Sequence, residues 1–270
     1  MTNALLNEQA ALWLDDMHTR LARYEPLPEK LTPETLESAY GIQAALVRRM
    51  QLRGLKPLGH KIALSSPEMQ KMVGIDRPVG GVIVGRDILS SPARVRAANH
   101  GRLCIECEVA VRLGTTLSAD TAPFSDADIA AAIDACAAAF EIVDDRNADY
   151  RALDVNNLVA DNTWNAGIVL GPIQELSAEM AGAGYPALAD ATVTLQENGT
   201  TVSEGSGGDA LGHPFNSVRA LANELVRQGR TLKAGEWILT GSVIRTHFPD
   251  VGSKLVCRHS VLGDVEIEVV

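Results

Sequence analysis

Short apolar stretches with the alternation of β-strands, separated by glycine and proline, fill the chain from about Leu58 to its end. They constrain the fold more than any other feature, because short strands must pair with several neighbours to bury their apolar faces. Asn198-Gly199, between two alternating stretches, predicts a hairpin with a two-residue turn. The stretches are GHKIAL, GGVIVGRDIL, CIECEVAVRL, AAFEIV, AGIVLG, ATVTLQENGTTVSE, EWILTG, KLVCRH and DVEIEVV.

Two helices are predicted ahead of these strands. Residues 4–24 read as an amphipathic helix, in which Leu5, Leu12 and Leu21 fall near helical spacing with Trp13 and Met17. The prolines of residues 25–32 indicate a linker. A second helix is expected to begin with Thr32 as its N-cap and Pro33 as its first residue, and to end at Gly54.

Two further helices interrupt the strands. One is predicted over residues 126–136 with Ser125 as its cap, and the other over residues 213–227, ending near Gly229. The predicted fold class is α+β. A helical N-terminal arm over residues 1–57 precedes a β-rich body over residues 58–270.

The charge balance excludes several kinds of partner. Lys and Arg number 24 against 34 Asp and Glu, a formal net charge of −10, and aromatic residues are 4%. Phosphate backbones and anionic lipid repel such a chain, so nucleic acid and membrane surfaces are not expected partners. The first residues carry acids where a signal peptide needs a basic and then an apolar run. A cytoplasmic location with reduced cysteines is therefore expected.

Several catalytic motifs are missing from the sequence. GxGxxG and GxSxG do not occur, and no two histidines lie four residues apart, as a helical zinc motif requires. Cys104 and Cys107 form a CxxC within a predicted strand, where residues three apart point to opposite faces. We therefore expect small buried thiols there, and no redox pair.

Two glutamates share one face of that same strand. Ile105, Cys107 and Val109 should be buried on one side, which leaves Glu106 and Glu108 side by side on the other. Like charges this close repel, so such a pair either faces solvent or requires a cation between its members.

Glu141 and Lys61 are charged residues inside apolar runs. A buried carboxylate is costly unless a Lys or Arg or a metal ion compensates it, so both explanations of Glu141 stay open. Lys61 either extends to solvent or remains inside against an anion. With Glu106 and Glu108, Glu141 completes an oxygen-only set of ligands, which suits Mg²⁺ or Mn²⁺ better than Zn²⁺.

Seven motifs in order then resemble the fumarylacetoacetate hydrolase superfamily, and within it the branch of 2-keto-4-pentenoate hydratases and 4-oxalocrotonate decarboxylases. The resemblance spans residues 33–270 and implies a helical N-terminal portion, a β-rich body with a mixed sheet roll, and homo-oligomers. The motifs are GHKIALS, GIDRP, IECEVAVRLG, FEIVDDR, VADN, GDALGHPFNSV and ILTGS.

The resemblance also implies roles for particular residues. Mg²⁺ or Mn²⁺ would be held by Glu106, Glu108 and Glu141, and Lys61 and Asp161 would be catalytic. The implied substrate contacts are Ala63, Leu64, Trp164, Thr240 and Ser242. Trp164 departs from the family pattern, in which a small residue or serine is expected; it would cap the pocket or stack on a flat substrate, or else simply fill the core.

The activity expected from the resemblance is addition of water to a 2-hydroxy-2,4-dienoate, which gives a 4-hydroxy-2-oxo acid, in bacterial catabolism of aromatic ring-cleavage products. Decarboxylation of a 2-oxo-3-enedioate is the first alternative, because both reactions use an enolate at C2. Hydrolysis of a C–C bond in an acylpyruvate and a non-catalytic subunit that scaffolds a pathway partner enzyme are the others.

Overall fold

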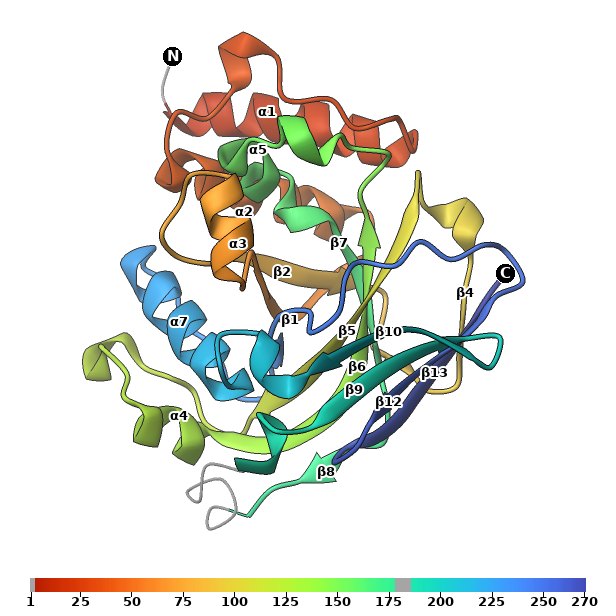
Figure 1. Cartoon of the computed structure of the whole chain (residues 1–270). Coiled ribbons are helices and arrows are strands. Elements are labelled where there is room, and N and C mark those ends of the chain that lie inside the picture. Colours follow the sequence, from red (N-terminus) through yellow and green to blue (C-terminus); the bar gives the residue numbers. More distant parts are fainter. Residues whose placement is uncertain (1–2, 178–185) are drawn as a thin grey trace.

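The computed structural model describes residues 3–177 and 186–270 (Figure 1). The predicted α+β class is confirmed: helices of the N-terminal part lie together at one end of the molecule, and the strands form most of the rest, with α4 and α7 beside them. The α-helices are α1 Asn3–Thr19, α2 Leu36–Leu52, α3 Pro67–Met72, α4 Asp126–Ala132, α5 Val155–Ala160 and α7 Pro214–Arg227. The 3-10 turns are η1 Glu29–Leu31, η2 Ala97–Asn99, η3 Ala119–Thr121, η4 Tyr150–Ala152, η5 Asn162–Trp164, η6 Pro186–Leu188 and η7 Gly207–Asp209.

The strands of the described residues form two mixed sheets. The larger sheet has the order β2-β1-β11-β5-β6-β7-β3, with β8 also paired to β6, and the smaller has the order β10-β9-β12-β13-β4. The larger sheet contains β1 Lys56–Ala63, β2 Val79–Gly85, β3 Leu89–Ser90, β5 Leu103–Leu113, β6 Ile133–Asp144, β7 Asn165–Leu170, β8 Gln174–Glu175 and β11 Trp237–Leu239. The smaller contains β4 Ala93–Val95, β9 Thr192–Glu197, β10 Thr200–Ser206, β12 Lys254–His259 and β13 Gly263–Val269.

Two asparagine side chains connect strands near the two ends of the larger sheet, which curls into a roll. Asn162 accepts a hydrogen bond from the Val82 N–H and donates one to the Val82 carbonyl, both at 2.8 Å. Asn165 accepts from the Val84 N–H at 3.0 Å. Asn165 is the first residue of β7 and Asn162 lies in η5 just before it, whereas Val82 and Val84 belong to β2. Strands β2 and β7 therefore approach each other although they are five positions apart in the sheet order. The curled sheet encloses the polar residues described below.

The N-terminal helices share a core with the body. Ala10 and Leu14 of α1 and Leu46 of α2 are fully buried in one cluster with Val82 and Val159. The predicted domain boundary between residues 57 and 58 stays a prediction. This cluster contains residues from both sides of it. The predicted apolar face of the first helix is confirmed only in part: Met17 is buried and Trp13 packs against this cluster. The predicted leucines, Leu5, Leu12 and Leu21, are exposed.

The second helix begins three residues later than predicted. Its N-cap is Thr35, not Thr32. The Thr35 hydroxyl accepts from the Ser38 N–H at 3.2 Å, and the Ser38 hydroxyl accepts from the Thr35 N–H at 3.1 Å. These two reciprocal hydrogen bonds satisfy the N–H groups of Thr35 and Ser38, which have no partner within the helix.

The helix predicted over residues 126–136 is also too long. The structure confirms Ser125 as its cap, but α4 ends at Ala132 and the chain continues as β6. Cys136 lies opposite Val111 of β5, and both are fully buried. Pairing in the centre of a sheet thus overrides the helical preference of an alanine-rich run.

Other expectations are confirmed. Asn198-Gly199 joins β9 to β10, and α7 follows its cap His213 and ends before Gly229. All four cysteines are free and buried. None of the helices in the described part of the chain has the length and apolar character to span a membrane.

Candidate active site

Three carboxylates meet on adjacent central strands, and we call Glu106, Glu108 and Glu141 the carboxylate triad. Glu106 of β5 lies directly opposite Glu141 of β6, and Glu108 follows two residues later on the same face of β5. One oxygen from each lies within 4.8 Å of the others. Glu108 and Glu141 are buried, and Glu106 is partly exposed. The strand alternation inferred from the sequence therefore holds, and the pair is not on an exposed face of the sheet: Glu108 is buried and Glu106 lines a cavity.

Each member of the triad accepts one hydrogen bond from the surrounding structure. The Gly241 N–H donates to Glu108 Oε2 at 2.7 Å, and the Asn165 amide donates to Glu141 Oε1 at 2.9 Å. The Thr246 hydroxyl donates to Glu106 Oε1. These bonds fix one oxygen of each carboxylate, while the Oε1 atom of Glu108 is buried without a hydrogen-bond partner.

Lys61 remains inside the protein. It is 4% exposed, and its Nζ lies 3.1 Å from Glu141 Oε2. Burial alone would lower the pKa of Lys61, but the three carboxylates outweigh burial and raise it, so the ammonium stays charged. Burial raises the pKa of Glu108, as do Glu141 and Glu106. Burial also raises the pKa of Glu141, although Lys61 opposes that effect.

Glycine lets two chain segments approach this group. Gly81 of β2 lies opposite Lys61, and a Cβ added there would lie 2.2 Å from Thr163 Oγ1 and 3.2 Å from Lys61 Cγ. Gly241 has a φ of +104°, and a Cβ there would lie 2.6 Å from Ser65 Oγ. A larger residue at either position would displace a wall of the site.

A cavity of about 660 Å³ opens beside the triad. Of the residues predicted for the site, those that line it are Lys61, Ala63, Leu64, Glu106, Trp164 and Ser242. Glu108 and Glu141 lie behind this lining, as does Thr240, whose hydroxyl donates to the Val109 carbonyl at 2.8 Å. The Ser242 hydroxyl is bound to the Ile244 carbonyl at 2.9 Å.

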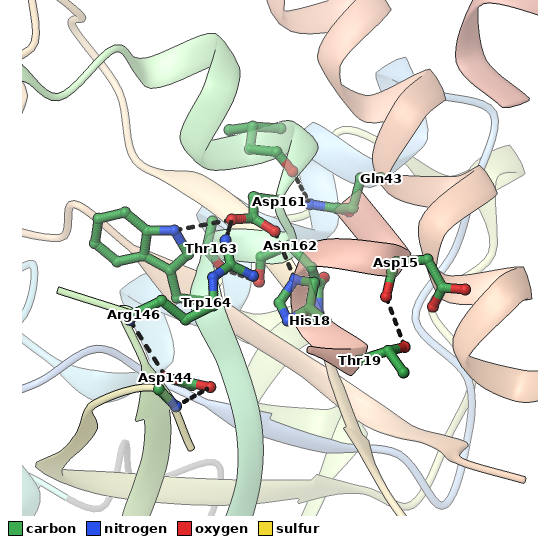
Figure 2. A network of polar contacts seen from close by, with 12 residues as sticks. Asp15, His18, Thr19, Gln43, Asp144, Arg146, Asp161, Asn162, Thr163 and Trp164 are labelled. Carbon is green, nitrogen blue, oxygen red and sulfur yellow. Dashed lines mark hydrogen bonds and ion pairs between the residues drawn. The ribbon is translucent and has the colours of Figure 1, made fainter. Parts of the chain in front are cut away.

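Asp161 does not reach the cavity. It is fully buried in what we call the Asp161 network, shown in Figure 2. Its carboxylate accepts from the Arg146 guanidinium, from His18 Nε2 of α1 at 2.6 Å, and from the Trp164 indole N–H at 3.1 Å. Burial would raise the pKa of Asp161, but Arg146 and His18 hold it below its usual value. Asp161 is thus outside the residues that line the cavity, and a catalytic role for it stays a prediction.

Trp164 ends a segment of unusual backbone. Asn162, Thr163 and Trp164 have φ angles of 54°, 49° and 59°, all in the left-handed region. Each such non-glycine residue costs on the order of 1–3 kcal/mol and persists only where its surroundings enforce it. Here the bonds from Asn162 to Val82 and from Trp164 to Asp161 do so.

Several residues at the site were not found from the sequence. Asn165, Gly241 and Thr246 bind the triad, and Tyr150 lines the cavity. Asn and Thr at strand ends and in loops carry no periodic pattern that marks them. Arg146 and Gly241 lie inside quoted motifs, but their contacts depend on segments distant in the chain.

The chain is similar to known proteins in sequence and in fold. The family model for the fumarylacetoacetate (FAA) hydrolase C-terminal region matches residues 59–270, so the chain belongs to the fumarylacetoacetate hydrolase family. Within that family it is 32% identical over 272 residues to 2-keto-4-pentenoate hydratase 2 of Dechloromonas aromatica, covering 99% of this chain and 96% of that protein. It is 29% identical to 4-oxalocrotonate decarboxylase of Pseudomonas putida over 263 residues, covering 97% and 94%.

A solved structure agrees over the full length. 4-Oxalocrotonate decarboxylase from Pseudomonas putida G7, complexed with magnesium and adipate, superposes with a TM-score of 0.89 at 26% identity, covering 100% of this chain and 99% of that one. A second structure of that decarboxylase contains calcium and acetate. The relatives thus belong to the two enzyme groups that the sequence motifs resemble.

Proposed function

We propose that the protein is a metal-dependent hydratase that adds water to a 2-hydroxy-2,4-dienoate. The observation that carries this proposal is the carboxylate triad with Lys61 beside a cavity of about 660 Å³. Several relatives named 2-keto-4-pentenoate hydratase support it, including the one from Dechloromonas aromatica.

The triad fits a divalent cation. Its donors are all carboxylate oxygens, which Mg²⁺ and Mn²⁺ prefer, and the buried, unbonded Oε1 of Glu108 is a free ligand atom. We assign Glu106, Glu108 and Glu141 as the residues that would hold Mg²⁺ or Mn²⁺. A bound ion would supply Lewis acidity, stabilising negative charge on the C2 oxygen of a 2-oxo acid.

The protein's own residues would handle charge and protons. The reaction moves a proton to C5 of the dienol, then adds hydroxide at C4 and a proton at C3. Lys61 lines the cavity with a charged ammonium, so we assign it to the substrate carboxylate or to proton transfer. Ala63, Leu64 and Ser242 would contact the substrate directly. Thr240 and Asp161 would act by positioning neighbouring groups.

Decarboxylation of a 2-oxo-3-enedioate is the second candidate, favoured by the full-length superposition on the decarboxylase from Pseudomonas putida G7. In that reaction the C5–C6 bond breaks, CO₂ leaves, and the electron pair moves through the conjugated chain to the C2 oxygen. The product is the dienolate that a hydratase consumes.

One assay separates these reactions. The protein is mixed with Mg²⁺ and 2-hydroxypenta-2,4-dienoate, and loss of the conjugated ultraviolet band is followed, with EDTA as control. We expect loss only with Mg²⁺. No loss, with CO₂ released from 2-oxohex-3-enedioate, would assign the decarboxylase. Cleavage of acylpyruvates alone would assign a hydrolase, and inactivity on all three would favour a non-catalytic subunit.

Lys61→Met tests the lysine. We expect kcat/KM to fall at least about 100-fold, because general acid–base or charge-pairing groups contribute that much. Lys254→Met, at an exposed lysine of β12, is the matched control and should leave the rate unchanged. A wild-type rate in Lys61→Met would remove Lys61 from the mechanism.

We also propose a homo-oligomer in the cytoplasm, associated with an enzyme of the same catabolic sequence. The exposed Leu5, Leu12 and Leu52 of the N-terminal helices offer apolar surface for a second copy. Light scattering on the purified protein tests the oligomer, for which a monomeric mass would count against the proposal.

A further inference from the structure

The charges along the cavity are unevenly distributed. Besides Lys61 and Glu106 near the triad, the described lining includes the exposed carboxylates Glu68, Glu204 and Asp209 and one guanidinium, Arg245. Three acids against one base would repel a second carboxylate on a substrate whose first carboxylate lies at the triad. Because these groups are exposed, the repulsion is modest and weakens with salt.

Another part of the lining is apolar. We define the tail wall as five lining residues whose side chains form a continuous hydrophobic and aromatic group: Val143, Tyr150, Leu153, Leu158 and Trp164. Trp164 packs edge-on against Tyr150 and Tyr24, with ring centroids 5.7 Å and 5.2 Å away. Its indole N–H is already bound to Asp161, so it can offer a ligand only apolar ring surface.

The tail wall is held in place from behind. The Asp161 network ties Trp164 to Arg146 after β6 and to His18 at the end of α1 (Figure 2). Within residues 3–177 and 186–270, Asn162 to Trp164 is the one place where three successive non-glycine residues are left-handed. A backbone strained at a cavity wall and stabilised by a buried ion network indicates that the ring's position is a functional constraint.

We propose that the tail wall is a subsite for an uncharged, apolar chain beyond C4, with Trp164 as its specificity-determining residue and the Asp161 network as the positioning device. The inference rests on the proposed function, because the triad must hold the 2-oxo acid end. Such a subsite would favour binding of 2-oxo acids with alkyl tails over binding of dicarboxylates.

Binding of unreactive 2-oxo acids tests this without turnover. Calorimetry on the whole chain with Mg²⁺ compares pyruvate, 2-oxohexanoate and 2-oxoadipate, which share one head group. Burying three methylenes stabilises binding by about 2 kcal/mol. We therefore expect 2-oxohexanoate to bind at least about 10-fold more tightly than pyruvate and than 2-oxoadipate.

Variants assign the effect. Trp164→Leu should reduce the preference for 2-oxohexanoate over pyruvate at least about 3-fold and leave pyruvate affinity unchanged. His18→Gln should do the same more weakly, whereas a purely structural role would lower all affinities together. Glu68→Gln with Glu204→Gln, at exposed positions that do not endanger folding, should improve 2-oxoadipate binding at low salt.

The outcomes are distinct. Equal affinity of the wild type for 2-oxohexanoate and 2-oxoadipate would overturn the tail inference and leave the metal-dependent head site intact. Absence of Mg²⁺-dependent binding for all three acids would overturn the proposed function and the inference with it. An unchanged preference in folded Trp164→Leu would remove Trp164 as the determinant.

Discussion

Glu106 differs from the other two carboxylates of the triad, because it lines the cavity while Glu108 and Glu141 lie behind it. A substitution there removes one candidate ligand without leaving a fully buried charge unpaired. The hydroxyl of Thr246 remains to pair with a neutral side chain. Glu106 is therefore the position at which a metal role can be separated from a folding role.

Glu106→Gln is expected to abolish metal-dependent turnover, with kcat/KM reduced at least about 100-fold, since even residues around metal ligands contribute up to that much. The circular dichroism spectrum should stay that of the wild type. Mn²⁺ affinity by calorimetry and the rate with Mg²⁺ are the measurements. Glu266→Gln, at an exposed glutamate of β13, is the matched control. Full activity in Glu106→Gln would refute the site.

Some boundaries of helices and strands are set by neighbouring residues in the sequence, and others by tertiary contacts. The hairpin at Asn198-Gly199 and the start of α4 at its cap Ser125 follow from turn and cap residues alone. The length of α4 does not, because residues 133–136 pair with β5. Helix α2 lies between these cases: a threonine cap was foreseen, but the reciprocal bonds with Ser38 select Thr35 over Thr32.

Thr35→Ala should lower the free energy of unfolding by about 1 kcal/mol, the usual effect of losing an N-cap. Thr32→Ala is the control, because the Thr32 hydroxyl donates to the Leu27 carbonyl and caps no helix N–H. It should change stability less. Urea unfolding of both variants makes the comparison, and an equal loss in both would argue against the capping box.

His259, at the end of β12, predicts a pH dependence. Its Nδ1 accepts from the backbone N–H groups of Val261 and Leu262 at 3.3 and 3.1 Å, and burial lowers its pKa to about 4. The unfolded chain therefore takes up a proton first. The stabilisation is complete above the ordinary histidine pKa and is lost as pH falls from about 6.5 to about 4.

The matched variant is His259→Asn, whose side-chain oxygen can accept the same bonds at every pH. Between about pH 7 and about pH 5 the wild type should lose about 2 kcal/mol more unfolding free energy than the variant. Urea unfolding at both pH values measures this. Parallel losses in the two proteins would show that His259 titrates normally.

At the scale of the whole molecule, the triad concentrates negative charge inside the fold. Three carboxylates face one ammonium, and burial raises the pKa of Glu108 and of Glu141. The strands that carry them are the central ones, and α1, α2 and the smaller sheet pack around them. A cation bound at the triad would therefore raise the free energy of unfolding of the entire chain.

Mg²⁺ is therefore expected to raise the thermal midpoint, because a ligand at 100 times its dissociation constant stabilises a fold by about 2.7 kcal/mol. Thermal unfolding with Mg²⁺, with Na⁺ at equal ionic strength, and with EDTA is the measurement. Glu106→Gln should abolish the Mg²⁺ effect. An equal shift with Na⁺ would indicate general screening instead of a bound ion.

The sequence by itself determined the α+β class, the alternation that puts Glu106 and Glu108 on one face, the hairpin at Asn198-Gly199 and the helix cap at Ser125, because each depends on residues a few positions apart. Only the tertiary structure decided that Glu141 lies opposite Glu106, that Lys61 points inward, and that Asp161 binds His18 and Arg146 behind the cavity. Those contacts join segments up to 143 residues apart, and their existence depends on strand order and on how the sheet curls. Local periodicity carries no information about either.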